Sequence, residues 1–559
     1  MDEREILRMI YPGRLKLPKL GLGSEHRLVE RLFGLREGSI SGDSVLYSLS
    51  LLGFFVAFSL LLREPSLIPV GIAASLILFL SLIYLPLAFF RIRRARVLSD
   101  LMNFLVQFLT LSRVVSYDRA FEESVEGLGE EFMEAYGKYL AKEFHTVAEA
   151  VSWLAERLGE YSDAAETVLL ILASELKKPS PDFSSVLNES LECLQTANLV
   201  EFNIFSESFR LSSLLLGLVP VIAYVIFPLF FSLSGKSVTL GIVSGGVFVV
   251  FSSIFICIYI LTKYPSAFTF TALNPDREAT RNFLKADIPD TSSSLSSRSP
   301  FSKQLLPAVL ASIAFPPLLI LLSVVVLWHS HRYSPFLRYV EACKKVQSTL
   351  PPYLRSVSFR LRMGEPLERA MEGFNLDMPV ARLFRAEAAG RVLFDSLSLV
   401  VEKMFKKLKT SGEALSATLE GLKDYSLRIL GYKDALSSQI STTRGAMHTY
   451  FFMIPAISIT CLLALQKIGQ KMQEVGTSSF ITGKQLVGKV NPYVASPFVA
   501  LSLLVCLAGF AVLQILCDEV ISKEIAIAKL RTFGLGIGAT GVLLTLFYFT
   551  SLFGFFGLR

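Results

Sequence analysis

Residues 67–96 read LIPVGIAASLILFLSLIYLPLAFFRIRRAR, an uncharged apolar block that runs directly into a group of arginines. The block Leu67–Phe90 contains no Asp, Glu, Lys or Arg, and a helix of this length crosses about 30 Å of hydrocarbon. Seven further blocks share this character: Ser44–Leu62, Leu211–Gly235, Ser237–Thr262, Leu305–Trp328, Ala446–Gln466, Val490–Cys517 and Thr532–Leu558. A core helix of a soluble protein imitates one such block but not eight. The sequence therefore predicts an all-α, multi-pass helical membrane protein.

The arginines that end this block set the expected orientation of the chain. Four of the residues 91–96 are arginine, whereas the turn REPS before the block contains only Arg63. Arginine beside a span marks the cytoplasmic side of a membrane. Residues 1–43 begin with acidic residues and lack an apolar run. We therefore expect them to form a cytoplasmic segment of a cell-membrane protein rather than a cleaved signal peptide.

Two long polar blocks separate the apolar ones, and both have helical periodicity. Apolar residues recur every three or four positions, at Leu98, Leu101, Met102, Leu105 and Leu109 in the first block and at Leu350, Leu354, Val357 and Leu361 in the second. Each block is expected to form a small helical bundle, referred to as a lobe. The expected order begins with an N-terminal segment (1–43), two spans (44–90), a first lobe (91–208) and two further spans (209–262). A Ser-rich linker (263–304), a broken or re-entrant membrane segment (305–328), a second lobe (329–445) and a C-terminal membrane region (446–559) follow.

The two lobes share short matches in the same order. The matches are DRAFE (118–122) with ERAME (368–372), ELKK (175–178) with MFKK (404–407), and SLECL (190–194) with TLEGL (418–422). Each of these matches is weak by itself, but their common order favours an internal duplication. Two unrelated amphipathic bundles are the alternative.

Three apolar blocks lie between the lobes, and three crossings would put the lobes on opposite sides of the membrane. The block Leu305–Trp328 contains Pro316 and Pro317, which divide it into halves too short to span singly. We expect this block to be broken or re-entrant, so that both lobes stay on one side. A further crossing hidden in the neighbouring blocks is the alternative.

The lobes carry opposite net charges. Residues 91–208 contain 11 Lys and Arg against 20 Asp and Glu, giving −9, and residues 329–445 contain 19 against 12, giving +7. A basic lobe attracts lipid headgroups, nucleic acid, its acidic sister or an acidic protein, although a solvated face needs no partner. The opposite signs favour a protein contact, and we expect no nucleic-acid partner. The densest basic part consists of Arg360, Arg362, Arg369, Lys403, Lys406, Lys407 and Lys409.

No pattern in the sequence is typical of an enzyme. SGKS (234–237) resembles the end of a phosphate-binding loop, but Phe230 stands where that loop requires glycine. GLGIGATG (534–541) lies inside the last apolar block. The histidines form no HExxH pair that would bind zinc. We therefore expect no catalytic residue, cofactor or metal ligand.

The apolar blocks also bear on transport. All eight lack Asp, Glu, Lys and Arg, which ion-coupled transport normally requires inside the membrane. Pairs of glycines, Gly241 with Gly245 and Gly534 with Gly538, instead have the spacing of close helix packing. A transporter or channel for a small solute is the alternative function. A receptor scaffold is disfavoured, because the outer turns REPS and SGKS leave little room for a ligand-binding domain.

Membrane helices that alternate with two helical lobes, each opened by an amphipathic helix and a turn into an acidic helix, resemble the type II secretion system F-domain proteins. LPPYLRSVSFRLRMGEPLERAMEGF (350–374) is most similar to that family, through its leucine-proline start, its glycine and its small-residue helix. The additional N-terminal pair of spans resembles the archaeal members, which serve archaellum and archaeal type IV pilus assembly. The first lobe departs from the pattern, because Val114 stands where Gly364 does and no proline matches Pro351.

This resemblance implies a function that the residues alone do not give. Such platform proteins hydrolyse no ATP; their lobes dock on a cytoplasmic hexameric secretion ATPase, and their spans help to lift pilin-like subunits from the lipid bilayer into a filament. A homodimer would suit the base of such a filament. Whether the filament is an archaellum, an adhesive pilus or a secretion pseudopilus stays open. The expected docking residues are Asp118, Arg119, Glu122, Arg360, Arg362, Glu368, Arg369, Glu372, Lys406, Lys407 and Lys409.

Overall fold

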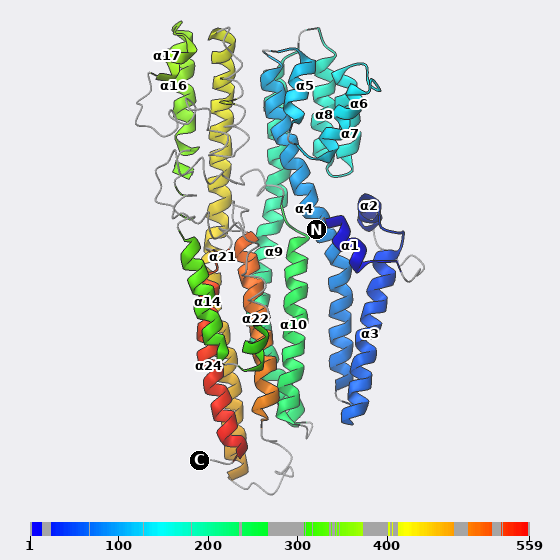
Figure 1. Cartoon of the computed structure of the whole chain (residues 1–559), viewed down its shortest axis with the longest axis vertical. Helices are drawn as coiled ribbons and strands as arrows, with labels where there is room; N and C mark the ends of the chain where they lie inside the picture. Colours follow the sequence, from blue (N-terminus) through cyan, green and yellow to red (C-terminus); the bar gives the residue numbers. More distant parts are fainter. Residues whose placement is uncertain are drawn as a thin grey trace.

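The computed structural model describes residues 3–13, 24–265, 307–372, 401–405, 412–474, 490–516 and 527–556, apart from short gaps inside these ranges. The described residues form helices joined by turns, and no strand occurs among them (Figure 1). The helices are α1 (Glu3–Ile10), α2 (Ser24–Leu32), α3 (Ser39–Leu62), α4 (Leu67–Leu111), α5 (Tyr117–Val125), α6 (Glu130–Leu140), α7 (Val147–Gly159), α8 (Asp163–Leu176), α9 (Phe183–Leu233), α10 (Val238–Leu261), α14 (Leu318–Tyr333), α16 (Leu350–Arg362), α17 (Leu367–Glu372), α21 (Gly412–Glu474), α22 (Pro492–Leu516) and α24 (Arg531–Phe556).

Seven of the described helices are long and apolar enough to cross a membrane: α3, α4, α9, α10, α21, α22 and α24. Their apolar parts pack together in one half of the molecule, named here the apolar half, and α5–α8, α16 and α17 stand at the opposite, polar end (Figure 1). Large side chains such as Leu60, Leu61 and Phe230 are exposed on the outside of the apolar half. Such surfaces are stable in hydrocarbon rather than in water. The predicted fold class is confirmed at this level: the chain is a multi-pass helical membrane protein.

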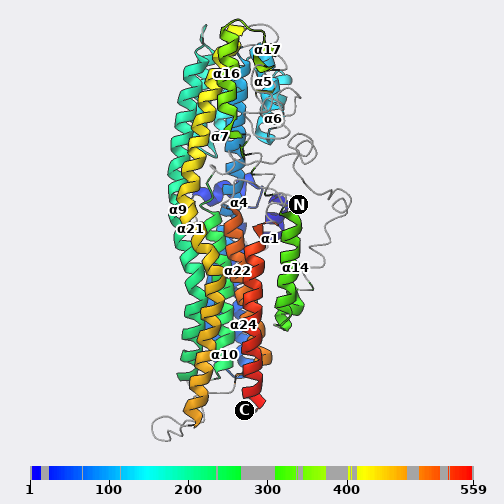
Figure 2. The same cartoon turned by 90° about the vertical axis from the view of Figure 1, so that its left-hand side faces the viewer.

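The fifth apolar block is not among the seven candidate spans of the described residues, and it contributes the shorter helix α14. α14 begins directly after Pro317 and has 16 residues, about 24 Å of helix, which is short of the hydrocarbon thickness of about 30 Å. Figure 2 shows α14 beside α24 and ending partway along the apolar half. At its other end, the exposed Trp328 ring lies 5.8 Å from the Arg332 guanidinium, a pairing typical of a lipid–water boundary.

From partway along the apolar half, α14 runs back toward the polar end (Figure 1). Helices α16 and α17 and the first part of α21 stand at the polar end together with α5–α8 (Figure 1). The N-terminus lies near the junction of the two halves, and the C-terminus lies at the far end of the apolar half. Seven candidate spans, an odd number, agree with this separation of the termini.

Three helices pass from the apolar half into the polar end without a break. α4 has 45 residues, α9 has 51 and α21 has 63. At 1.5 Å per residue, α21 is about 95 Å long. Prolines inside their apolar parts each remove a backbone hydrogen bond without ending the helix; they are Pro86, Pro220, Pro228 and Pro455. Through these three helices, the polar end is joined to the spans by continuous helix.

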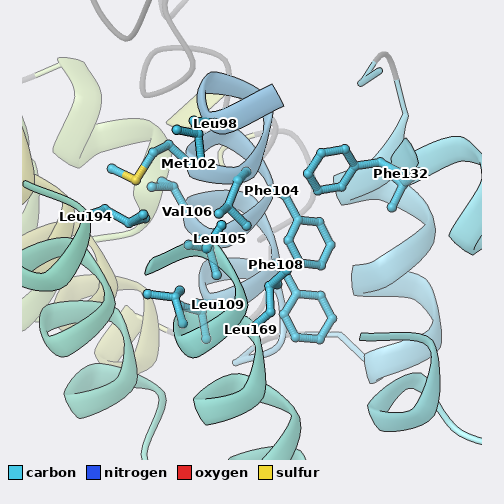
Figure 3. Close-up of a cluster of buried hydrophobic side chains, with 14 of the residues drawn as sticks. Leu98, Met102, Phe104, Leu105, Val106, Phe108, Leu109, Phe132, Leu169 and Leu194 are labelled. Carbon is cyan, nitrogen blue, oxygen red and sulfur yellow. The ribbon is translucent and has the colours of Figure 1, made fainter. Parts of the chain in front are cut away.

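The second half of α4 forms the centre of the first lobe. Its predicted apolar face is buried, at Leu98, Leu101, Met102, Leu105 and Leu109. Burial is not confined to that face. Figure 3 shows Phe104 and Phe108 pointing the other way, toward Phe132 of α6, and the Phe104 and Phe132 ring centroids are 5.6 Å apart. Since a helix buried on all sides is a core helix, α4 organises the lobe around itself.

The described part of the second lobe consists mainly of an antiparallel pair of helices, α16 and α21, with the short helix α17 after α16. The predicted apolar face of α16 is buried, at Leu350, Leu354, Val357 and Leu361. Ser358 and Ser416 lie side by side in this contact, with their hydroxyl oxygens 3.1 Å apart. Apolar residues of α16 and α21 belong to the same cluster as those of α4, so one continuous core joins the two lobes. The remainder of the predicted bundle, residues 373–400 and 406–411, lies outside the described residues.

Glycines hold the spans at close distance, as their spacing predicts. A Cβ atom at Gly241 of α10 would lie 2.6 Å from Pro228 Cα of α9, and one at Gly245 would lie 3.2 Å from the Ala223 carbonyl oxygen. On α24, a Cβ at Gly538 would lie 2.7 Å from Ser323 Oγ of α14. The packing role predicted for these glycines is confirmed. The chain needs them because any side chain would push the helices apart.

We predict that Gly241→Ala lowers the stability of the protein by about 1–3 kcal/mol, because the added methyl group meets backbone atoms of α9 that cannot rotate away. Thermal unfolding of the detergent-solubilised chain measures the loss. Gly53→Ala is the control, since a Cβ at Gly53 of α3 meets nothing within 4 Å. Equal melting temperatures for the two variants would contradict the close α9–α10 contact.

Candidate docking site

The arginines of residues 91–96 lie where α4 leaves the apolar half, and each pairs with a carboxylate from another helix. The nitrogen–oxygen distances are 3.9 Å for Arg91 with Glu25, 2.9 Å for Arg93 with Glu131, 2.6 Å for Arg94 with Glu201 and 2.9 Å for Arg96 with Glu3. These carboxylates belong to α2, α6, α9 and α1. The arginines and their partners, named the neck, therefore tie four helices to α4 at the base of the polar end.

The pair Arg93–Glu131 is the most buried part of the neck, with side chains 16% and 8% exposed. The Tyr161 hydroxyl donates a second hydrogen bond to Glu131 Oε1 at 2.9 Å. Burial disfavours the charged carboxylate, but the hydrogen bonds from Arg93 and Tyr161 outweigh it, so the pKa of Glu131 lies below its ordinary value. Burial also raises the pKa of Tyr161 to about 12, which keeps its hydroxyl protonated as a donor.

The N-terminal segment packs against the neck. Leu7, Val29 and Phe33 are fully buried in the core that contains α4. Arg4 pairs with Glu130 of α6 at 3.3 Å, and the Tyr11 hydroxyl donates to the Leu82 carbonyl of α4. Residues 3–13 and 24–38 thus pack around α4 where it leaves the apolar half.

The docking residues predicted in the first lobe lie on α5. Asp118, Arg119 and Glu122 are exposed. The Tyr139 hydroxyl donates to Asp118 Oδ1 at 2.6 Å, and Arg119 pairs with Glu123 at 3.3 Å. Exposed pairs of this kind contribute little to stability and exchange partners readily. These side chains are therefore accessible to a partner protein.

The docking residues predicted in the second lobe divide into two groups. Arg362 donates through Nε to Ser416 Oγ at 3.1 Å and pairs with Glu420, and Arg360 pairs with Glu365 at 3.5 Å. These two arginines thus have partners within the lobe. Glu368 and Arg369 are exposed on α17. The side chain of Glu372, and Lys406, Lys407 and Lys409, lie outside the described residues.

A glycine turn places α17 at the tip of the second lobe. Gly364 has φ +82°, in the left-handed region that favours glycine. The Glu365 N–H donates to the Arg360 carbonyl at 3.1 Å and the Gly364 N–H to the Leu361 carbonyl at 3.1 Å, which closes α16 with a Schellman turn. Figure 1 shows α17 and α5 both at the polar end, on different sides of α4 and α21. The two charged clusters are therefore separate surfaces at one end rather than one site.

Within the described ranges, no group of three or more His, Cys, Asp or Glu side chains is arranged to hold a metal ion. Comparison with known proteins gave no matching family model, no match among curated proteins and no match among solved structures. The function must therefore be argued from the residues and their arrangement.

Sequence reasoning did not find the neck. It identified the four arginines but assigned them to the membrane boundary alone. The adjacent acidic residues Glu130 and Glu131 at the start of α6 are the signal that was available. Their pairing with α4 depends on the position of α6 beside α4. A charge pattern along the chain does not specify how two helices pack.

We predict that Glu131→Gln lowers stability at pH 7 by about 3 kcal/mol, because it leaves the half-buried Arg93 without a counter-charge. A carboxylate with a lowered pKa stabilises the fold above its ordinary pKa of 4.5, and this contribution is lost as the pH falls through and below that value. The difference in melting temperature between variant and parent should therefore shrink as the pH falls from 7 to 4. Glu160→Gln is the control, because its partner Arg157 is exposed. A difference independent of pH would contradict the assigned ion pair.

Proposed function

We propose that this chain is the membrane platform of a type IV pilus-like or archaellum assembly machine. In this proposal, a cytoplasmic hexameric secretion ATPase, referred to as the motor, docks on the polar end. The seven spans lie in the cell membrane and help to move pilin-like subunits out of the bilayer. The chain supplies no catalytic group and passes on mechanical work done by the motor.

The observation that carries this proposal is the continuity of α4, α9 and α21. Each helix has one part in the apolar half and one part at the polar end. A motor that turns or tilts the polar end therefore moves three spans directly, because no flexible linker absorbs the displacement. The single core that joins both lobes makes them move together.

The order of elements within the two lobes also supports the proposal. In the first lobe, the end of α4, a turn and α5 are followed by α9, which runs back into the apolar half. In the second, α16, a turn and α17 are followed by α21, which does the same. The matched sequences SLECL and TLEGL fall near the start of α9 and α21, where Leu194 and Leu422 are both buried. This repetition is what a duplicated F-type lobe would produce.

The exposed charges at the polar end suit a docking surface. Arg369 and Glu368 on α17, and Asp118 and Glu122 on α5, face solvent at the end farthest from the spans. Arg360 and Arg362 are less suited to docking, because their partners Glu365 and Glu420 lie within the lobe. We therefore assign docking to the tips formed by α5 and α17.

Co-purification with the secretion ATPase encoded in the same genome tests this assignment. We expect the detergent-solubilised chain to capture the motor at low salt. Arg369→Glu and Asp118→Arg should each reduce the captured amount roughly tenfold, as expected for losing one well-placed charge contact. Arg157→Glu, which changes an exposed charge on α7, is the control and should not reduce capture.

Equal capture by all three variants would exclude the α5 and α17 tips as the docking surface. The larger proposal would fail if the unaltered chain captured no motor and instead moved a solute by itself in liposomes.

A further inference from the structure

The polar end exposes large apolar side chains that no lipid covers. On α16, Phe359 and Met363 are 63% and 70% exposed and lie one helical turn apart. Arg355, one turn before Phe359, is also exposed, and within the described part of the chain it has no acidic partner. This face, named the α16 face, is apolar with a basic edge. Adjacent exposed apolar residues in water mark a surface that another protein covers.

A second face with complementary features lies on α6. Met133 and Leu140 are 48% and 62% exposed and lie two turns apart, with Gly137 between them. The exposed carboxylates Glu130 and Glu134 lie on the same side of the helix. Glu130 pairs with Arg4 at 3.3 Å, and Glu134 pairs with Lys138 at 3.5 Å in an exposed contact of the kind that exchanges partners readily. This α6 face is apolar, and the exposed carboxylate of Glu134 lies at its edge.

Gly137 has no explanation within one copy of the chain. A Cβ atom there would meet nothing within 4 Å, so no contact inside the chain requires glycine. Glycine inside a helix costs about 0.5–1 kcal/mol relative to alanine. A gap between Met133 and Leu140 is, however, the shape that receives a large side chain from a partner helix.

We propose that the α16 face of one copy docks on the α6 face of a second copy, with Phe359 seated over Gly137. Figure 1 places α16 and α6 at opposite edges of the polar end, with α4 and α21 between them, so one chain does not join its own two faces. The basic edge at Arg355 then meets the exposed carboxylate of Glu134, where Arg355 replaces or joins Lys138 as its partner. The net charges of the lobes, +7 for residues 329–445 and −9 for residues 91–208, favour the same pairing. It requires only two copies of the chain and is independent of the motor.

Photo-crosslinking of the full chain in membranes that lack the motor tests this pairing. A photoreactive benzoylphenylalanine in place of Phe359 should give a covalent dimer, and mass spectrometry should locate the adduct in Glu130–Leu140. The same group in place of Leu170, an exposed residue of α8, should give no dimer. Absence of the dimer, or an adduct in another segment, would overturn the proposal.

Four further variants separate docking from misfolding. Gly137→Trp should reduce the dimer adduct roughly tenfold, because the indole fills the gap. Gly421→Trp changes an equally open glycine of α21 and should leave the adduct unchanged. Arg355→Glu should also reduce the adduct, and adding Glu134→Arg to the same chain should restore it. Failure of the double reversal to restore the adduct would exclude the pairing of these two edges.

Discussion

A helix satisfies its own backbone hydrogen bonds in lipid and in water alike, which allows α4, α9 and α21 to pass from one solvent to the other without interruption. The remaining features of the fold follow from this. A lobe that grows out of the end of a span cannot move independently of that span. Buried apolar residues of all three helices also belong to one core at the polar end, outside the apolar half. The polar end is therefore continuous with the spans through these helices, unlike a soluble domain tethered to a membrane anchor.

The neck fixes the direction in which α4 leaves the apolar half. Arginines at a span end normally remain in water or reach lipid phosphates, but here they meet carboxylates of α1, α2, α6 and α9. Each of these ion pairs connects α4 to a neighbouring helix, so that it restrains both helices. The half-buried Arg93–Glu131 contact, with the Tyr161 hydroxyl, is the strongest of these, because burial makes a lost partner costly. Pushing the first lobe sideways must therefore either carry the N-terminal segment along or break these pairs.

Much of the fold follows from local sequence, since spans and amphipathic faces are local properties. The absence of charge in each block identified the candidate spans, and Pro316 with Pro317 marked the one block that contributes only a shorter helix to the described residues. The spacing of Leu98, Leu101 and Leu105 identified one buried face of α4 but not the opposite face with Phe104 and Phe108, because a helix buried on all sides has no polar stripe to reveal it. Of the expected docking residues, Arg362 has a partner within its lobe. The contact between Arg362 and Glu420 depends on how α16 packs against α21. The sequence does not specify this packing, because the two residues are far apart along the chain.

The central claim is that the two lobes lie on the same face of the membrane. The proposed motor can act on both lobes only if this is so. Labelling with a membrane-impermeant maleimide, in sealed vesicles of known orientation, measures it directly. The unaltered chain serves as the blank for its own cysteines. The account predicts that Glu143→Cys in the first lobe and Arg369→Cys in the second are labelled from the same face, and Arg63→Cys, in the turn between α3 and α4, from the other. Labelling of Arg369→Cys from the face that labels Arg63→Cys would contradict it.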